Sequence, residues 1–243
     1  MTGPVTPPPP DALPRPPLVQ RVGYLIEACR NRRVLHLGCA NHPYTAEALA
    51  DGALLHTRLA QAAGELWGLV ADEPALDLLR AQGFSRLVRG DLEALDHLAP
   101  DAFPGLAPEG FDVIVAGEVI EHLPNPGRFL QGVQGLMRPR TRLLLTTVNA
   151  YCGFRAAVYA LRGRGGLAEP VHPDHVAYYS LATLRRLVET SGLAARRALF
   201  YDVGVEHRKH LRPALRIIND VLVRLAPQLA DGVILECDLP AVR

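Results

Sequence analysis

Residues 34–41 read VLHLGCAN, a run of apolar residues that stops abruptly at a glycine. A parallel strand buried on both faces has such a leucine-rich and β-branched sequence. A glycine at the carboxyl end of the strand lets the backbone approach a ligand closely. The run does not continue as GxGxxG, the dinucleotide-binding fingerprint. This stretch therefore predicts a buried strand that leads into a ligand-binding loop of another kind.

Three later segments repeat the pattern of a strand followed by a loop. They read LWGLVAD at 66–72, LVRGDL at 87–92 and FDVIVAGEVIEHL at 111–123. Together with 34–41, their order and spacing resemble those of the class I S-adenosylmethionine (SAM) methyltransferases. The resemblance covers roughly residues 30–200. It implies a Rossmann-like α/β fold, SAM as the cofactor and methyl transfer as the reaction.

The composition is that of an ordinary globular protein. The 243 residues suffice for one sizeable α/β domain, and 49% are hydrophobic and 21% charged. A formal net charge of +1 gives no basic field that would favour nucleic acid. We find no apolar run of membrane-spanning length and no signal peptide. The four cysteines form no CxxC pair, so a reducing cytoplasm is the expected location.

The order of predicted elements indicates a doubly wound, seven-stranded and mostly parallel sheet. The resemblance implies that its last strand is antiparallel. Residues 1–17 contain eight prolines and predict a disordered tail before a single domain at 18–243. Helices are expected at 18–29 and 44–63, and Ser180 should cap a further helix that runs through Thr190. Insertions that act as lids are expected at 148–180 and 202–231. The expected strands are 33–37, 66–70, 86–89, 111–115, 142–147, 196–201 and 232–237.

Ligands of a doubly wound sheet lie over the carboxyl ends of its strands. The resemblance therefore places Gly38, Cys39 and Ala40 beside the methionine part of SAM. His36 stands where the family usually has an acid, and Ala40 where it usually has a second glycine. His36 is thus expected at the cofactor loop, and its alternative role is that of a packed core histidine.

Two aspartates are candidates for the nucleoside part of SAM. The family's ribose-binding acid aligns with Val70, and Asp72 stands two residues later, where it can also cap a helix. Asp91 matches the acid that accepts a hydrogen bond from the adenine amine, with Leu92 beside the ring. The alternative role of Asp91 is that of a turn residue.

The densest cluster of functional side chains is GEVIEH at 117–122. Gly117 and Glu118 are expected at the cofactor. Glu118, Glu121 and His122 can share one side of a helical turn. Their ExxEH pattern resembles that of the ubiquinone-pathway O-methyltransferases, in which these positions can serve a divalent metal. The sequence favours a metal-free floor of the active site, with activity that is indifferent to a chelator.

The segment HPDHV at 172–176 follows the fifth predicted strand and should return over the active site. Histidine is the side chain best matched to proton transfer near neutral pH. His175, flanked by Asp174 and Tyr178, is the first candidate for a general base, followed by His172 and then His122. The HxxH spacing also suits a metal, but the segment offers two ligands. In the alternative, one histidine caps local backbone and the other faces solvent.

These features predict a SAM-dependent methyltransferase that acts on a hydroxyl of a small molecule, such as a sugar, a glycan-linked group or a natural product. Nucleic acid and membrane partners are not expected, and a homodimer is left open. The alternatives are a methyltransferase acting on nitrogen or on a macromolecule, and a SAM-binding protein without catalysis. A Rossmann-type oxidoreductase is disfavoured because GxGxxG is absent.

Overall fold

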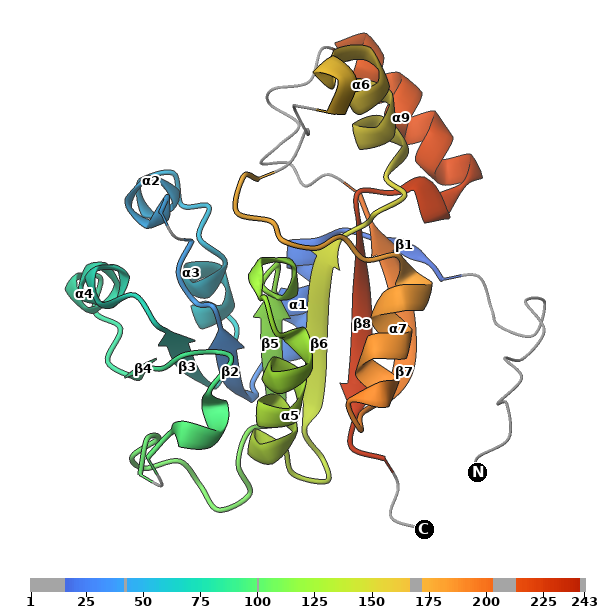
Figure 1. Ribbon diagram of the computed structural model, residues 1–243. Helices are drawn as coiled ribbons and strands as arrows, with labels where there is room; N and C mark the ends of the chain where they lie inside the picture. The colour runs from blue at the N-terminus through green and yellow to red at the C-terminus, as the bar shows by residue number, and fades with distance from the viewer. Residues whose placement is uncertain (1–15, 42, 100, 167–171, 203–212, 241–243) are drawn as a thin grey trace, which may run out of the picture.

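The strands of the described residues form one sheet in the order β1-β7-β8-β6-β5-β2-β3-β4 (Figure 1). The computed structural model describes residues 16–41, 43–99, 101–166, 172–202 and 213–240. Neighbouring strands are parallel, except that β8 runs antiparallel to both β6 and β7. The strands are β1 (Leu18–Val19), β2 (Arg33–Leu37), β3 (Glu65–Val70), β4 (Leu87–Arg89), β5 (Val113–Gly117), β6 (Arg142–Val148), β7 (Ala194–Tyr201) and β8 (Gly232–Asp238).

Helices cover both faces of the sheet. The α-helices are α1 (Arg21–Cys29), α2 (Thr45–Ala50), α3 (Leu55–Ala60), α4 (Glu73–Ala81), α5 (Pro126–Leu136), α6 (Gly153–Arg162), α7 (Leu181–Thr190) and α9 (Pro213–Leu225). Short 3₁₀ turns are η2 (Leu95–His97), η3 (Ile120–His122), η4 (Arg164–Gly166) and η5 (Pro227–Leu229). Apolar side chains of α5 and α7 fill the core on one face, and those of α1 and α3 fill it on the other.

The central strand β2 shows why the fold is doubly wound. Leu35 and Leu37 belong to the core beneath α5 and α7, whereas Val34 belongs to the core beneath α1 and α3. All three side chains are fully buried. Since successive side chains of a strand point to opposite faces, an unbroken apolar run needs a layer of helices on each side. The fold class predicted from the sequence is confirmed, including the antiparallel last strand.

Two details differ from the predicted elements. The sheet has eight strands rather than seven, because 18–19 form a short edge strand that pairs with β7 before α1 begins. The helix expected at 44–63 is divided into α2 and α3. Gly52, at φ +62°, lies just after Asp51, the C-cap of α2, and this left-handed residue prevents the helix from continuing.

The two expected insertions contribute helices that stand beyond the carboxyl ends of β5 and β6. Figure 1 shows α6 and α9 together above this edge of the sheet. A Cβ on Gly153 at the start of α6 would lie 3.0 Å from Leu222 Cδ2 of α9, so the two helices are in close contact. None of the described helices combines the length and the apolar character needed to cross a membrane. The proline-rich tail lies, up to residue 15, outside the described residues.

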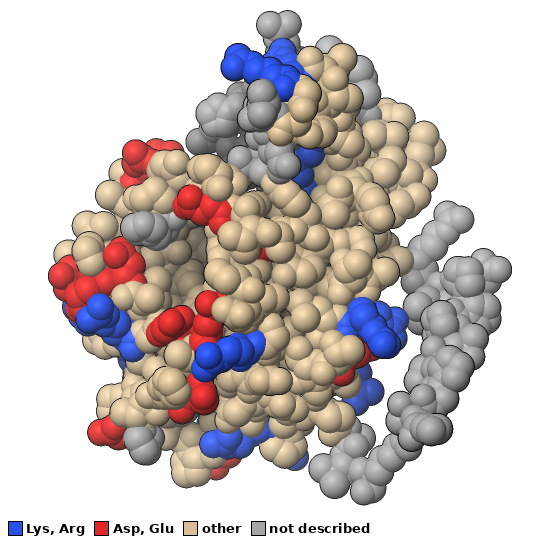
Figure 2. Space-filling view, in the orientation of Figure 1, with Lys and Arg blue, Asp and Glu red and all other residues tan. Residues whose placement is uncertain are grey.

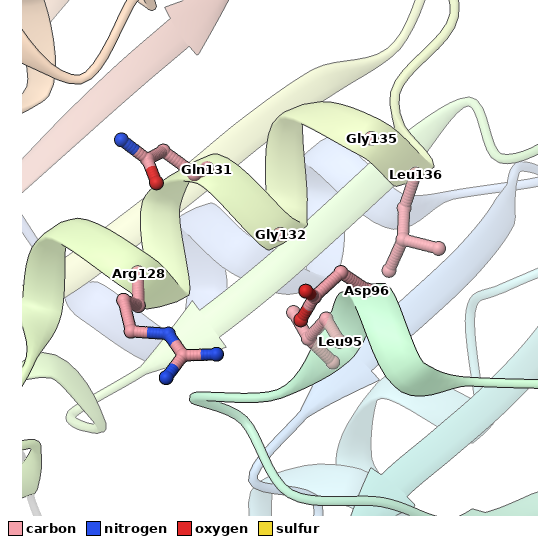
Figure 3. Close-up of a pocket in the computed structure, with 7 residues that line it drawn as sticks. All are labelled: Leu95, Asp96, Arg128, Gln131, Gly132, Gly135 and Leu136. Atoms are coloured by element: carbon pink, nitrogen blue, oxygen red, sulfur yellow. The ribbon is translucent and has the colours of Figure 1, made fainter.

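Helix α5 packs closely against η2 at one glycine and is open at another. A Cβ at Gly132 would lie 2.7 Å from Leu95 Cβ, whereas a Cβ at Gly135 would meet nothing within 4 Å. Figure 3 shows both glycines in a groove of about 440 Å³ that Asp96 and Arg128 also line. Gly132 is therefore a tightly packed position, and Gly135 is an open position on the same helix.

We therefore predict opposite effects on stability for the same substitution at these two positions. Gly132→Ala should lower the free energy of unfolding by about 1–3 kcal/mol, because η2 must move away from α5. Gly135→Ala should raise it by about 0.5–1 kcal/mol, because alanine favours the helix. Urea unfolding followed by circular dichroism measures both. Equal effects of the two variants would contradict the described packing of η2 on α5.

Candidate active site

The carboxyl ends of β2, β3, β4 and β5 lie along one edge of the sheet, because these strands are parallel. The loops that follow them carry most of the candidate residues. Figure 2 shows the surface hollowed between the side that carries α2 and α4 and the side that carries α5, with acidic side chains around the recess. A recess at strand ends is where an open α/β sheet binds its ligand.

The turn after β2 depends on Gly38. This residue has a φ of +68°, and its N–H donates to the carbonyl of Leu69 at 2.8 Å. A Cβ at this position would lie 2.5 Å from Cγ2 of Val119 in the loop after β5. Both the backbone conformation and this contact therefore require glycine. Of the next two residues, Cys39 is buried and Ala40 is half-buried. Neither residue therefore extends a large side chain from this loop.

His36 lies in the interior, below this loop. Its Nδ1 is 3.2 Å from Nδ1 of His56 in α3, and the two rings are stacked. Burial, followed by the neighbouring His56, holds the pKa of His36 well below its usual range, and burial lowers the pKa of His56 to about 4. Both imidazoles are therefore neutral at neutral pH, and one Nδ1 donates to the other. The structure thus places His36 as a packed histidine, and no sequence pattern pointed to His56.

The two candidate aspartates both make local backbone contacts. Asp72 is the N-cap of α4, and its Oδ2 accepts from the Ala75 N–H at 3.1 Å. Asp91 Oδ1 accepts from the Glu93 N–H at 2.8 Å in the turn after β4, and the residue is exposed. Leu92 beside it packs partly against the core. The structure therefore confirms the alternative roles, a helix cap for Asp72 and a turn residue for Asp91. Both carboxylates lie just after the carboxyl ends of strands, at the edge of the sheet that carries the recess.

Glu118 is held in an unusual conformation at the end of β5. Its φ is +55°, which is rare for a residue with a side chain and marks backbone strain. Its Oε1 accepts from the Tyr201 hydroxyl at 2.5 Å, and its Oε2 lies 3.5 Å from Arg21 Nη1. Burial, with the charge of Glu118, keeps the pKa of Tyr201 well above its usual value, so the phenol remains a donor. Arg21 and Tyr201 lie far from the motifs, and no pattern in the sequence pointed to them.

The prediction that Glu118 shares one side of a helical turn with Glu121 and His122 is wrong. The turn η3 begins only at Ile120, after the left-handed Glu118, so the three residues do not lie on one continuous helical turn. The carbonyl of Glu121 accepts backbone hydrogen bonds from Val176 and Ala177 at 2.9 and 3.2 Å. These bonds hold the segment that contains His175 directly against η3. As predicted, the segment after β6 returns to this edge of the sheet.

The result is a cluster of three histidines. The His122 ring centre is 4.6 Å from that of His175 and 5.4 Å from that of His172. Tyr44 makes an edge contact with His172 from the opposite side, 5.7 Å between ring centres. His172 Nδ1 accepts from the Asp174 N–H at 3.3 Å, as in the backbone-capping alternative. His175 and His122 are thus the members of the cluster without that local contact.

The surroundings of the cluster shift the pKa values of its groups so that their neutral forms are favoured. Burial, with the neighbouring His122, lowers the pKa of His175 to about 4, and burial also lowers that of His122. Burial, with the charge of Glu118, raises the pKa of Glu121 to about 8. A neutral imidazole offers a lone pair, either to a proton or to a cation.

Comparison with known proteins now identifies the family. A family model described as a methyltransferase domain matches residues 17–198, about three quarters of the chain. The chain belongs to this methyltransferase family. It is a class I SAM-dependent methyltransferase, as the four motifs predicted, and SAM is its cofactor.

Individual relatives are distant. The ubiquinone biosynthesis O-methyltransferase of Azoarcus sp. is 24% identical over 197 residues, which are 74% of this chain and 78% of the relative. The same enzyme of Coxiella burnetii is 23% identical and covers 68% of both chains. A solved SAM-dependent methyltransferase from Archaeoglobus fulgidus has a TM-score of 0.52 at 17% identity, over 90% of this chain and 91% of its own. Magnesium protoporphyrin IX methyltransferase from Synechocystis PCC 6803, solved with bound SAH, has a TM-score of 0.53 at 15% identity, over 90% and 80%.

The residues at this edge of the methyltransferase fit SAM. The exposed carboxylate of Asp91, with Leu92 beside it, matches an adenine with an amine donor. Asp72 stands nearer the loop after β2, at the end of the adjacent strand. The left-handed turn at Gly38 brings backbone rather than side chain to the recess. Gly117 ends β5, and Glu118 follows it directly.

We predict that Asp91→Ala weakens SAM binding by about 1–2 kcal/mol, a factor of roughly 5–30, because one hydrogen bond to the adenine amine is lost. Isothermal calorimetry measures this affinity. An S-adenosylhomocysteine analogue without the exocyclic amine is the matched control, since its affinity should be the same for the variant and the unaltered protein. If Asp91→Ala weakens the two ligands equally, Asp91 acts through its turn rather than through the amine.

Proposed function

We propose that this methyltransferase transfers the methyl group of SAM to a hydroxyl of a small molecule, such as a sugar, a glycan-linked group or a natural product. The observation that carries the proposal is the cluster of His122, His172 and His175 at the carboxyl edge of the sheet. A hydroxyl must lose its proton during methyl transfer, whereas a neutral amine can react through its lone pair. A group of imidazoles at this place therefore favours oxygen as the acceptor atom.

Residues around the recess have separate roles in this proposal. His36, Gly38, Cys39 and Ala40 form the loop and its support for the methionine part of SAM. Asp72 binds the ribose, Asp91 and Leu92 bind the adenine, and Gly117 and Glu118 border the methyl-transfer region. The proposed roles of Asp72 and Glu118 are compatible with the contacts that their carboxylates already make.

The chemical step is a direct displacement. When bound, SAM supplies an activated methyl group on its sulfonium. With that group in place, the chain's own part would be to orient the acceptor hydroxyl towards the methyl carbon and to take up the hydroxyl proton on an imidazole. His175 is the first candidate to receive it, because its position against η3 is held by backbone hydrogen bonds. The chain contributes mainly orientation and this proton acceptor.

The two insertions, 148–180 and 202–231, form a lid of a single domain at 18–243 in this proposal. Arg155 of α6 makes an ion pair with Asp231, and its Nη2 donates to the carbonyl of Asn149 at 3.0 Å. Asn149 Nδ2 in turn donates to the carbonyls of Gln228 and Ala230 at 2.8 Å each. These contacts join both insertions to the carboxyl edge of the sheet, next to the histidine cluster. A covered site suits a small acceptor, and the net charge of +1 gives no attraction for nucleic acid.

We predict that His175→Ala lowers turnover by roughly 10²–10⁴-fold and leaves the affinity for SAM unchanged. The loss should be smaller at high pH, where the acceptor hydroxyl gives up its proton more readily. Steady-state kinetics from pH 6 to pH 10, with calorimetric SAM binding as the control for folding, tests this. Near-normal turnover would move the role of base to His172 or His122. If all three alanine variants are active, the reaction requires no base.

The acceptor atom is tested directly with a matched pair of substrates. A panel of monosaccharides and their glycosides is incubated with SAM carrying a deuterated methyl group, each beside the amino sugar that replaces one hydroxyl by an amine. Mass spectrometry should find the label on oxygen of the hydroxyl compound. Transfer to the amine alone would contradict the proposed function and favour N-methylation.

A further inference from the structure

We propose that the methyl acceptor is an uncharged pyranoside, and that Tyr44 and Tyr178 are the aromatic surfaces that bind its ring. Five rings form a continuous series of contacts, the aromatic arc, which consists of Tyr44, His172, His122, His175 and Tyr178. Consecutive ring centres along the arc are 5.7, 5.4, 4.6 and 6.0 Å apart. The inference rests on the proposed function, because it names the substrate class of the same site.

The arc joins three parts of the chain at the carboxyl edge of the sheet. Tyr44 lies between the loop after β2 and helix α2, His122 ends η3, and residues 172–178 return from the insertion after β6. In Figure 1 the returning segment passes above the ends of β5 and β6, between α2 and α7. One end of the arc is thus next to the loop assigned to the methionine part of SAM. A ligand on the arc therefore lies beside the part of SAM that reacts.

The two tyrosine rings at the ends of the arc are open to solvent. Tyr44 is 44% exposed and Tyr178 is 38% exposed. Tyr44 directly precedes α2, but its side chain does not cap that helix. Tyr179, the residue after Tyr178, forms a β-bridge with Asn149, so the backbone at this end is fixed. A single exposed aromatic residue is ordinary, whereas two of them at the ends of one row of imidazoles have the arrangement of a binding surface.

The chemistry of the arc matches the two kinds of surface on a pyranose ring. A pyranose has apolar C–H groups on a face and hydroxyl groups around its edge. The C–H groups can pack on the electron-rich face of a tyrosine ring, which removes apolar surface from water. A hydroxyl group both donates and accepts hydrogen bonds, and a neutral imidazole has one donor and one acceptor. The arc therefore provides partners for both surfaces of the sugar.

The centre of the arc argues against a planar aromatic acceptor. A flat apolar ligand is usually bound in a pocket that is lined mainly by apolar side chains and has few polar groups. The three central rings of the arc are all imidazoles, and they contact one another. Such a centre suits an acceptor that carries several hydroxyl groups.

The charge beside the arc argues against an anionic acceptor such as a sugar phosphate. The exposed carboxylate of Asp174 lies 3.7 Å from Nδ1 of His172. Acidic side chains also surround the recess in Figure 2. A carboxylate accepts strong hydrogen bonds from hydroxyl groups but repels a phosphate. These charges therefore favour an uncharged sugar.

Binding is tested separately from methyl transfer. A panel of methyl hexopyranosides and methyl 6-deoxyhexopyranosides is screened by saturation-transfer-difference NMR with the full-length protein and S-adenosylhomocysteine. A bound member should receive saturation at its ring C–H protons. Tyr44→Ala and Tyr178→Ala should each weaken its binding by about 10-fold or more, because a central aromatic contact is lost. Tyr44→Phe keeps the aromatic ring and should retain binding.

The matched control is Leu78→Ala, which removes an exposed apolar side chain of α4 outside the arc and should leave binding unchanged. Circular dichroism and the affinity for S-adenosylhomocysteine confirm that each variant is folded. Absence of binding by every member of the panel would overturn the inference. Equal binding by Tyr44→Ala and the unaltered protein would also overturn it.

Steady-state kinetics with a pyranoside that accepts the methyl group gives a second readout. Tyr44→Ala should raise KM by about 10-fold or more and leave kcat nearly unchanged, because the ring contributes binding rather than proton transfer. The 6-phosphate of the same sugar should be a poorer acceptor. A phosphate that binds more tightly than the uncharged pyranoside would contradict the assigned substrate class.

Two further outcomes separate this inference from the proposed function. Methyl transfer to the oxygen of a simple phenol, such as 4-methylphenol, but to no pyranoside would contradict the sugar and leave O-methylation standing. Pyranoside binding that requires Tyr44, with transfer to the amino sugar alone, would leave the role of the arc standing and contradict the proposed function.

Discussion

The parallel register of β2 with β3 and β5 determines where everything else in this protein lies. Parallel strands end at the same edge, so the loops that begin at Gly38, Ala71 and Glu118 meet although they are far apart in the sequence. The contact between Gly38 and Val119 then joins two of these loops without any room for a side chain. The loop after β2 and the loop after β5 are thus parts of one packed unit. A larger side chain at position 38 would therefore displace Val119 in the loop after β5.

Two carboxylates of one short motif show how environment decides the role of a side chain. Glu118 is tied to a phenol and a guanidinium, so its charge is compensated. Glu121, three residues later, is fully buried beside His122 and His175. The left-handed backbone at Glu118 turns the chain before η3 starts, so the two residues do not share one helical turn. Strain at a strand end is often retained where it directs side chains into a site.

The sequence predicted the sheet well because its signals are local. Apolar runs marked the buried strands, and Ser180 marked the start of α7, where the structure has a reciprocal cap with Thr183. Elements that depend on partners were harder to predict. The two residues of β1 are a strand because β7 lies beside them. None of the residues of helix α6 is fully buried. The sequence analysis therefore treated this segment only as part of an insertion.

The candidate site was predictable in its parts but not in its assembly. Motif positions indicated Gly38, Asp91, Glu121 and the histidines individually. The pairing of His36 with His56 and the convergence of His175 on Glu121 arise from tertiary contacts between distant segments. Spacing along one helical turn suggested the wrong partner for Glu121, because it could not reveal a positive φ at Glu118. Local sequence patterns identify the candidate catalytic and binding residues, and the topology of the fold determines which of these residues are in contact.

The short strand β1 has a consequence for how the chain is made. Leu18 and Val19 precede β2 to β6 in the chain, whereas their partner β7 follows those strands, together with β8, which inserts between β6 and β7. The half of the sheet formed by β2 to β6 can assemble during synthesis. Its edge at β6 stays open until the carboxyl-terminal strands arrive, and an open strand edge is a template for pairing with other chains. The edge at β6 is therefore exposed during synthesis until β8 has been made and pairs with it.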